Sequence, residues 1–168
     1  MNISKACQLA LVKMLRLRQL ADSMELLGTD KTSTKLEVLR ELLSEVGERK
    51  VIIFTQFSKM ADILERELPH SLKITGQVEN KRRQLIIKKF NEEPGSLILL
   101  MTAAGQHGLN IQTASVIVHY DQEWSLAKMV QREGRAYRLG QKQNVLVYNL
   151  LAKGTIDYYI QKVLRKKQ

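Results

Sequence analysis

The sequence has one cysteine, Cys7, among 168 residues, and few aromatic residues. A single cysteine excludes a disulfide within the chain and a metal site built from several cysteines, which is typical of a reducing, intracellular setting. Aromatic residues make up 5% of the chain, too few for the base-stacking surface of a single-strand-binding protein. We expect an intracellular protein without a metal site on this chain, cytoplasmic in a prokaryote or virus and nuclear in a eukaryote.

Long apolar runs are also missing from the sequence. None reaches the roughly 18 residues that a membrane-spanning helix needs. Near the N-terminus, Lys5, Lys13, Arg16 and Arg18 interrupt the apolar pattern, which excludes a secretory signal peptide. The sequence therefore predicts no membrane partner, and we expect the isolated chain to be a monomer.

Acidic residues are few compared with basic ones. The chain has 27 Lys and Arg against 17 Asp and Glu, which gives a formal net charge of +10. Such an excess favours a polyanionic partner, with nucleic acid first. A merely soluble basic protein is the alternative, because net charge describes association and not fold.

The chain divides into two parts. Residues 3–27 place leucines among basic residues and predict one or two helices, which the break at Gly28-Thr29-Asp30 ends. We assign residues 1–32 to an N-terminal helical segment and residues 33–168 to a single domain. Thr34-Lys-Leu-Glu37 has the pattern of a capping box at the start of the next helix.

Short apolar runs alternate with helical patterns along the second part. This alternation predicts an α/β fold with a parallel sheet flanked by helices. Ligands bind such sheets beyond the carboxyl ends of the strands, so the loops after Phe54, Met101 and His119 become the functional candidates. The expected strands are 51–54, 72–74, 97–101, 116–118 and 145–151, and the expected helices after residue 50 are 57–68, 79–91, 125–138 and 155–165.

Three of these loops carry groups suited to a ligand. Gly105 and Gly108 follow the strand that ends at Met101 and let the backbone approach a phosphate, although such a loop is often only a turn. Thr55 and Gln56 follow the first strand, where Gln56 could equally cap the next helix. Trp124 follows the strand that ends near His119, and could pack in the core or contact nucleic acid.

Residues 131–141 read Gln-Arg-Glu-Gly-Arg-Ala-Tyr-Arg-Leu-Gly-Gln. On a helix, Gln131, Gly134, Arg135 and Arg138 share about one third of the circumference. Two guanidinium groups beside a glycine suit phosphate recognition. The alternative is a surface on which these arginines pair with local carboxylates.

The sequence also lacks a phosphate-binding loop of the form Gly-x-x-x-x-Gly-Lys-Ser/Thr. It lacks a paired acidic motif at a strand end that would hold magnesium. Arginines without a phosphate loop indicate half of a nucleotide site, since such arginines can be supplied to a phosphoryl group by another lobe.

These motifs together resemble the second RecA-like lobe of superfamily 2 helicases, specifically the Swi/Snf-type DNA translocases. Residues 51–57 resemble motif IV, residues 97–121 motif V and its extension, and residues 131–141 motif VI with its trailing Arg-x-Gly-Gln. Residues 145–159 resemble the strand and helix that close this lobe. The motifs occur in order over about four fifths of the chain.

The resemblance implies a role for each candidate. Arg135 and Arg138 would be arginine fingers that reach ATP, bound with Mg²⁺ mainly on a first lobe that this chain lacks. The chain alone would then be inactive as an ATPase. Gln131, Gly134, Gly105, Gly108 and Asn110 would face the nucleotide, and Thr55, Gln56, Thr102 and Trp124 would lie on or beside the track of double-stranded DNA.

Two other functions remain open at the level of sequence. One is an RNA helicase lobe, which the Arg-Leu-Gly-Gln tail of residues 138–141 argues against. The other is a non-enzymatic, basic module that binds nucleic acid. An α/β domain that binds a small molecule has little support, since no dinucleotide-binding glycine fingerprint follows the first strand.

Overall fold

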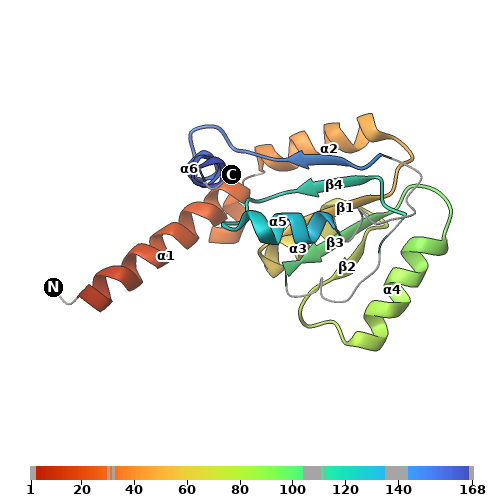
Figure 1. Ribbon diagram of the computed structural model, residues 1–168, viewed down its shortest axis with the longest axis horizontal. Coiled ribbons are helices and arrows are strands. Elements are labelled where there is room, and N and C mark those ends of the chain that lie inside the picture. Colours follow the sequence, from red (N-terminus) through yellow and green to blue (C-terminus); the bar gives the residue numbers. More distant parts are fainter. Residues whose placement is uncertain are drawn as a thin grey trace.

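The computed structural model describes residues 3–29, 31, 33–103, 111, 113–134 and 144–166. At its centre lies a five-stranded sheet in the order β2-β3-β1-β4-β5, and every neighbouring pair is parallel (Figure 1). The expected α/β fold is confirmed. The strands are β1 (Val51–Thr55), β2 (Leu72–Ile74), β3 (Ile98–Thr102), β4 (Val116–His119) and β5 (Leu146–Asn149).

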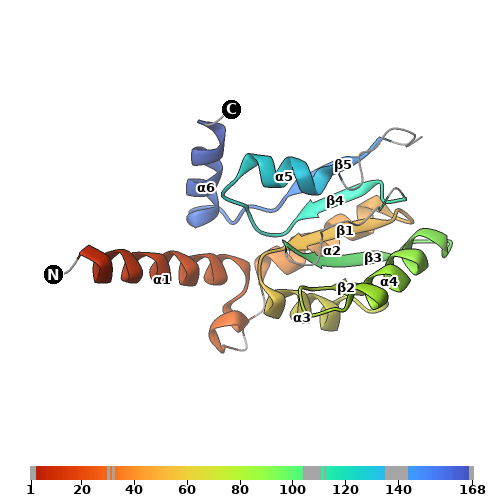
Figure 2. The ribbon, with the colours of Figure 1, turned by 60° about the horizontal axis from the view of Figure 1, so that its bottom comes forward.

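Helices flank both faces of this sheet (Figure 2). Helices α2 and α3 pack on one face, and α4 and α5 lie on the other. The helices are α1 (Ile3–Asp22), α2 (Thr34–Val46), α3 (Ser58–Glu67), α4 (Asn80–Glu92), α5 (Leu126–Glu133) and α6 (Ile156–Arg165), with a short 3₁₀ helix η1 (Met24–Leu27) after α1.

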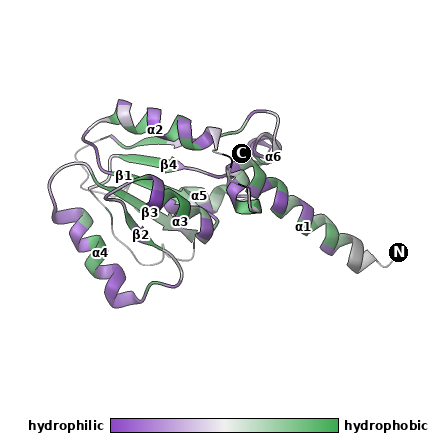
Figure 3. Cartoon of the chain, turned by 180° about the vertical axis from the view of Figure 1, so that it is seen from behind, coloured by the Kyte–Doolittle hydropathy of each residue, from purple (hydrophilic) through white to green (hydrophobic). Residues whose placement is uncertain are grey.

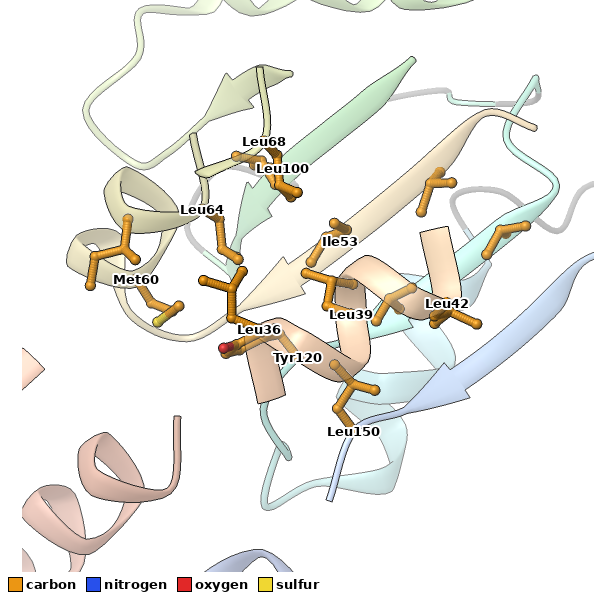
Figure 4. Close-up of a cluster of buried hydrophobic side chains, with 14 of the residues drawn as sticks. Leu36, Leu39, Leu42, Ile53, Met60, Leu64, Leu68, Leu100, Tyr120 and Leu150 are labelled. Atoms are coloured by element: carbon orange, nitrogen blue, oxygen red, sulfur yellow. The ribbon is translucent and has the colours of Figure 1, made fainter. Parts of the chain in front are cut away.

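Alternating side chains of the strands build two apolar layers. Ile53 of β1 and Leu100 of β3 point to the α2 and α3 face, where they join Leu39 and Leu64 in the cluster of Figure 4. Their neighbours in sequence point the other way, and Phe54 joins the second layer beneath α4. Because both faces are covered, these strands read as continuous apolar runs in the sequence.

Strand β5 differs from this pattern because it lies at the edge of the sheet. It spans Leu146–Asn149, a shorter range than the predicted 145–151. Leu146 is 37% exposed and Val147 is 39% exposed. A buried apolar run and an edge strand look alike in sequence, so the strand was predicted but its exposure was not.

The predicted capping box at the start of α2 is wrong. Ser33, not Thr34, is the N-cap, and its side chain makes no capping hydrogen bond. The Ser33 hydroxyl donates instead to the carbonyl oxygen of Asp22, at the end of α1. The N-cap of α2 therefore lies one residue before the predicted cap position, and its hydroxyl makes a tertiary contact and no local one.

The ends of α5 and α6 agree with the sequence to different extents. Helix α5 covers Leu126–Glu133 of the predicted 125–138, and residues 135–138 lie outside the described part. At the start of α6, the Thr155 hydroxyl accepts a hydrogen bond of 3.3 Å from the backbone N–H of Asp157. This side-chain cap fixes the beginning of the last helix.

The N-terminal segment is joined to the domain by a buried ion cluster. Lys35 Nζ, in the first turn of α2, lies 2.9 Å from Asp22 Oδ1 and 2.6 Å from Asp157 Oδ2. It also donates to the carbonyl oxygen of Tyr120 at 3.1 Å. Each of the three charged side chains is at most 5% exposed. The end of α1, the start of α2 and the start of α6 therefore meet at one ammonium group.

Helix α1 extends away from the sheet, and α6 lies beside its C-terminal end (Figure 1). Apolar residues recur among polar ones along α1 (Figure 3). The division into residues 1–32 and 33–168 stays a prediction. The exposed large apolar residues described in this segment are Leu9, Leu11, Val12, Leu15, Leu17, Leu20 and Leu27.

No helix in the described ranges is both long and apolar enough to cross a membrane.

Candidate functional site

The carboxyl edge of the sheet brings the predicted loops together. Strand β1 lies between β3 and β4, and its last residues pair with theirs: Thr55 with Thr102, and Phe54 with His119. The loops after these three strands therefore begin next to one another at one edge of the sheet, as expected for parallel strands. The chemistry of this edge depends on which side chains meet there.

The end of β1 is tied to the loop after β4 by one carboxylate. Asp121 Oδ2 accepts a hydrogen bond of 2.6 Å from the Thr55 hydroxyl and one of 2.8 Å from the backbone N–H of Gln56. Thr55 is fully buried, and Asp121 is 1% exposed. The Thr55 hydroxyl thus holds the loop, and its predicted contact with DNA stays a prediction.

A second carboxylate binds the Gln56 side chain. Gln56 Nε2 donates to Glu123 Oε2 at 2.7 Å, while Glu123 Oε1 accepts from the backbone N–H of Trp124 at 3.0 Å. Helix α3 has Phe57 as its N-cap, with no side-chain cap. Of the two interpretations left open for Gln56, the structure therefore contradicts the helix cap.

Arg132, on α5, completes this arrangement. Its Nη2 donates to Glu123 Oε2 at 3.1 Å, and its guanidinium carbon lies 5.5 Å from the centre of the Phe54 ring. The side chain is fully buried. Arg132, Glu123 and Gln56 therefore form one connection, from the helix that precedes Arg135 to the end of β1.

Arg132 and Glu123 are not among the site residues predicted from sequence. The available signal was spacing, because Arg132 follows the buried Met129 by three residues and so shares the inward face of α5. A charged residue on an apolar helix face needs a partner of opposite charge. Spacing alone does not identify that partner among the several acidic residues of the chain.

Burial shifts the pKa of the charged groups at this edge. It raises the pKa of Asp121, although the Thr55 hydroxyl, the Gln56 N–H and the cations Arg18 and Lys35 oppose the shift. Burial also lowers the pKa of Arg132, which Glu123 and Asp121 oppose. Arg18, from α1, lies 3.8 Å from Asp121 and donates to the carbonyl oxygen of Gln122 at 2.7 Å. The N-terminal helix therefore also contacts the site.

Several buried polar atoms at this edge have no hydrogen-bond partner among the described residues. An unpaired buried donor or acceptor costs about 1–3 kcal/mol, so a cluster of them indicates a place prepared for further polar contacts. The atoms are Thr102 Oγ1, His119 Nδ1, Asp121 Oδ1, Gln122 Nε2, Arg132 Nε and Arg132 Nη1.

Trp124 is half-buried and packs in a small apolar cluster between α5 and α6. Its ring meets that of Tyr159 edge-on, with centroids 6.4 Å apart and planes at 72°. The packing interpretation of Trp124 is confirmed. Trp124 is partly exposed, and its contact with DNA stays a prediction.

Two of the predicted nucleotide-facing residues lie in the described part of the arginine stretch. Gln131 is exposed on α5, and Gly134 directly follows that helix. A Cβ atom on Gly134 would lie 3.3 Å from the carbonyl oxygen of Val130, a tight contact. The residues Arg135, Arg138, Gly105, Gly108 and Asn110 lie outside the described residues, so their roles stay predictions.

The described residues offer no group of three or more His, Cys, Asp or Glu side chains that could hold a metal ion. The acidic side chains of the edge, Asp121 and Glu123, already accept from the donors named above.

Residues 34–140 match the helicase conserved C-terminal domain family, and the chain belongs to this family. It is a C-terminal RecA-like lobe of the Swi/Snf type. The relative "ATP-dependent helicase fft2" of Schizosaccharomyces pombe is 39% identical over 143 residues, which cover 80% of this chain and 11% of that protein.

Two solved structures of a Sulfolobus solfataricus SWI2/SNF2 ATPase core share the fold. The structure of the core domain alone has a TM-score of 0.74 at 33% identity and covers 94% of this chain. The structure in complex with double-stranded DNA has a TM-score of 0.70 at 32% identity and covers 90% of this chain. This chain spans 34% of each of those chains.

Proposed function

We propose that this chain is the second lobe of an ATP-dependent translocase on double-stranded DNA. In this proposal a first lobe holds ATP and Mg²⁺, and closure of the two lobes brings Arg135 and Arg138 onto the phosphates. Gln131 and Gly134 belong to the same nucleotide-facing surface. The loop residues Gly105, Gly108 and Asn110 lie between the nucleotide and the DNA.

The connection from Arg132 through Glu123 to Gln56 carries this proposal. It joins the helix that leads into Arg135 to a polar side chain at the end of β1, where parallel sheets bind ligands. A site that serves nucleotide and nucleic acid together needs such a link. A merely basic binding module would need only surface charge.

Arginine fingers suit this lobe because it lacks a phosphate loop of its own. In phosphoryl transfer, an arginine supplied from outside the nucleotide-binding lobe stabilises charge on the transferred group. Its contribution is typically on the order of 10³–10⁵ in rate. Repeated closure and opening of the lobes would then move the pair along the DNA backbone.

The DNA track in this proposal runs over the carboxyl edge of the sheet. Gln56 and Trp124 are partly exposed and face the DNA, whereas Thr55 and Thr102 are buried beside the track. The Thr55 hydroxyl holds the loop of Asp121, and the Thr102 hydroxyl, which has no partner among the described residues, lies near a DNA phosphate. The net charge of +10 supports a polyanionic partner. The DNA complex of the Sulfolobus ATPase core adds support by similarity.

The test is binding of this chain to duplex DNA, single-stranded DNA and duplex RNA, each labelled and measured at two salt concentrations. We expect duplex DNA to bind best, with an affinity that falls steeply with salt because phosphate contacts release counterions. Preference for duplex RNA would favour the RNA helicase lobe. Equal affinity for all three would favour the basic module, and no binding would mean that this lobe contacts DNA only when paired.

A further inference from the structure

One oxygen of Glu123 serves two donors from opposite sides of the site. Oε2 accepts from Gln56 Nε2 at 2.7 Å and from Arg132 Nη2 at 3.1 Å. The other oxygen, Oε1, accepts from the backbone N–H of Trp124. Gln56 belongs to the end of β1 and Arg132 to α5, so a change at one donor alters the acceptor that the other uses.

Arg132 is incompletely paired in this arrangement. The side chain is fully buried, yet Nε and Nη1 have no hydrogen-bond partner in the described part of the chain. A guanidinium group can bind a carboxylate through two parallel N–H donors, and such bidentate pairs are stronger than single ones. A buried cation with one hydrogen bond therefore gains stability from any movement that gives it a second.

Release of Gln56 from Glu123 would allow Glu123 to move toward Arg132. The Gln56 side chain is half-buried and lies where the proposed DNA track passes. If a DNA phosphate takes the Gln56 amide, Glu123 Oε2 loses its shorter hydrogen bond and is free to turn toward Arg132. The guanidinium group then pairs through two nitrogens, and α5 shifts with it because Arg132 is a buried residue of that helix.

We propose that Arg132 is a positioning residue: DNA contact at Gln56 releases Glu123 to pair fully with Arg132, and the resulting shift of α5 sets Arg135, three residues further on, for ATP hydrolysis. This inference rests on the proposed function. It adds the route by which DNA would stimulate hydrolysis, through one shared carboxylate oxygen.

The proposed function places this lobe in a two-lobed protein, and the experiment measures the ratio of its ATP hydrolysis rates with and without duplex DNA. Arg132→Lys keeps the charge but cannot form the bidentate pair. We expect the ratio to fall about 10-fold, within the usual range for coupling between two sites. Lys128→Met is the matched control, because Lys128 is an exposed cation on the same helix. It should leave the ratio unchanged.

A double variant separates coupling from loss of structure. If Gln56 and Arg132 act through one connection, Gln56→Ala with Arg132→Lys lowers the ratio no further than the more severe single change. Independent roles would multiply the two losses. Multiplied losses, or an unchanged ratio in Arg132→Lys, would overturn the inference.

The proposed function can fail separately. A wild-type protein without DNA-dependent hydrolysis would overturn the proposed function itself, and the inference with it. Thermal unfolding of each variant shows whether it folds. If Arg132→Lys does not fold, Gln56→Ala still tests the connection, because Gln56 is only half-buried.

Discussion

Lys35 Nζ on α2 lies 2.6 Å from Asp157 Oδ2 on α6, and the same ammonium lies 2.9 Å from Asp22 at the end of α1. Two buried carboxylates therefore share one buried cation. Asp157 also accepts from the backbone N–H of Ala152 at 3.0 Å, which fixes the loop before α6. Three segments from the beginning and the end of the chain depend on this ammonium, so the first two predictions concern it.

Lys35→Met is expected to lower the free energy of unfolding by about 3–5 kcal/mol, because it leaves Asp22 and Asp157 buried without a cation. Urea unfolding at pH 7 measures the change. Lys31→Met is the control, since Lys31 is exposed and its loss should cost little. A loss in Lys35→Met no larger than in this control would contradict the role of the cluster.

The stability of the chain should depend on pH through Asp22. Burial raises the pKa of Asp22 well above its ordinary value, and repulsion from Asp121 adds to the shift. The folded protein thus keeps this proton at a pH where the unfolded chain, with a pKa of about 3.9, has released it. Between those two pKa values the unfolded chain binds fewer protons, so the free energy of unfolding falls as pH rises.

Asp22→Asn isolates this effect, because the amide does not titrate. We expect the wild type to lose stability relative to Asp22→Asn as pH rises above about 4, until the raised pKa is passed. Urea midpoints of both proteins across this range give the difference. A difference that stays constant with pH would contradict a raised pKa, and a gain by the wild type would indicate a lowered one.

Arg135→Ala is expected to reduce DNA-stimulated ATP hydrolysis by the two-lobed protein by about 10³–10⁵, since it removes an arginine finger. DNA affinity should change little, because Arg135 faces the nucleotide in the proposed function. Steady-state phosphate release and DNA binding are measured on the same preparation. Arg165→Ala, which removes an exposed arginine of α6, is the control. Turnover like that of the wild type would rule out this assignment.

This chain alone is expected not to hydrolyse ATP. It lacks a phosphate loop, so it has no element of its own to hold the β- and γ-phosphates. Phosphate release by the purified chain, with and without duplex DNA, is the measurement. Release that scales with protein concentration and survives further purification would refute the prediction.

The small cluster between α5 and α6 should stabilise α5 locally. Ile160 is fully buried in this cluster with Met129 and Leu164, apart from the two main layers. Ile160→Ala is expected to lower the opening free energy of α5 by about 2 kcal/mol or more, and to affect the central strands less. Amide hydrogen exchange compares the two regions. Tyr158→Ala, at an exposed position of α6, is the control, and equal loss of protection in β1 would show a global effect instead.

The sheet could be predicted because its strands carry their own signal. β1 and β3 are buried on both faces, and such strands read as apolar runs whatever lies around them. Parallel strands also place their carboxyl ends together, so the meeting of Thr55 with the loop of Asp121 followed from the fold class. The candidate edge of the sheet was therefore accessible from sequence alone.

The buried charges could not be predicted in the same way. Lys35 precedes Leu36 in an ordinary amphipathic pattern, and nothing local shows that its ammonium turns inward to carboxylates far along the chain. Arg132 on α5 pairs with Glu123 in the loop before that helix, and this pairing depends on how Arg132 packs against Phe54. The Ser33 hydroxyl similarly donates to the carbonyl oxygen of Asp22 and makes no capping hydrogen bond in its own helix. Each of these depends on tertiary packing, which short-range spacing does not contain.

Among the described side chains of helix α1, Arg18 and Asp22 near its C-terminal end join it to the site and to the ion cluster. At 1.5 Å per residue its 20 residues form a rod about 30 Å long. For such a rod, each degree of rotation at the anchored end displaces the free end by about half an ångström. Small adjustments at the carboxyl edge of the sheet would thus be magnified at the tip of α1. A change in the angle of α1 at the site would therefore become a larger change of position at the N-terminal end of the helix.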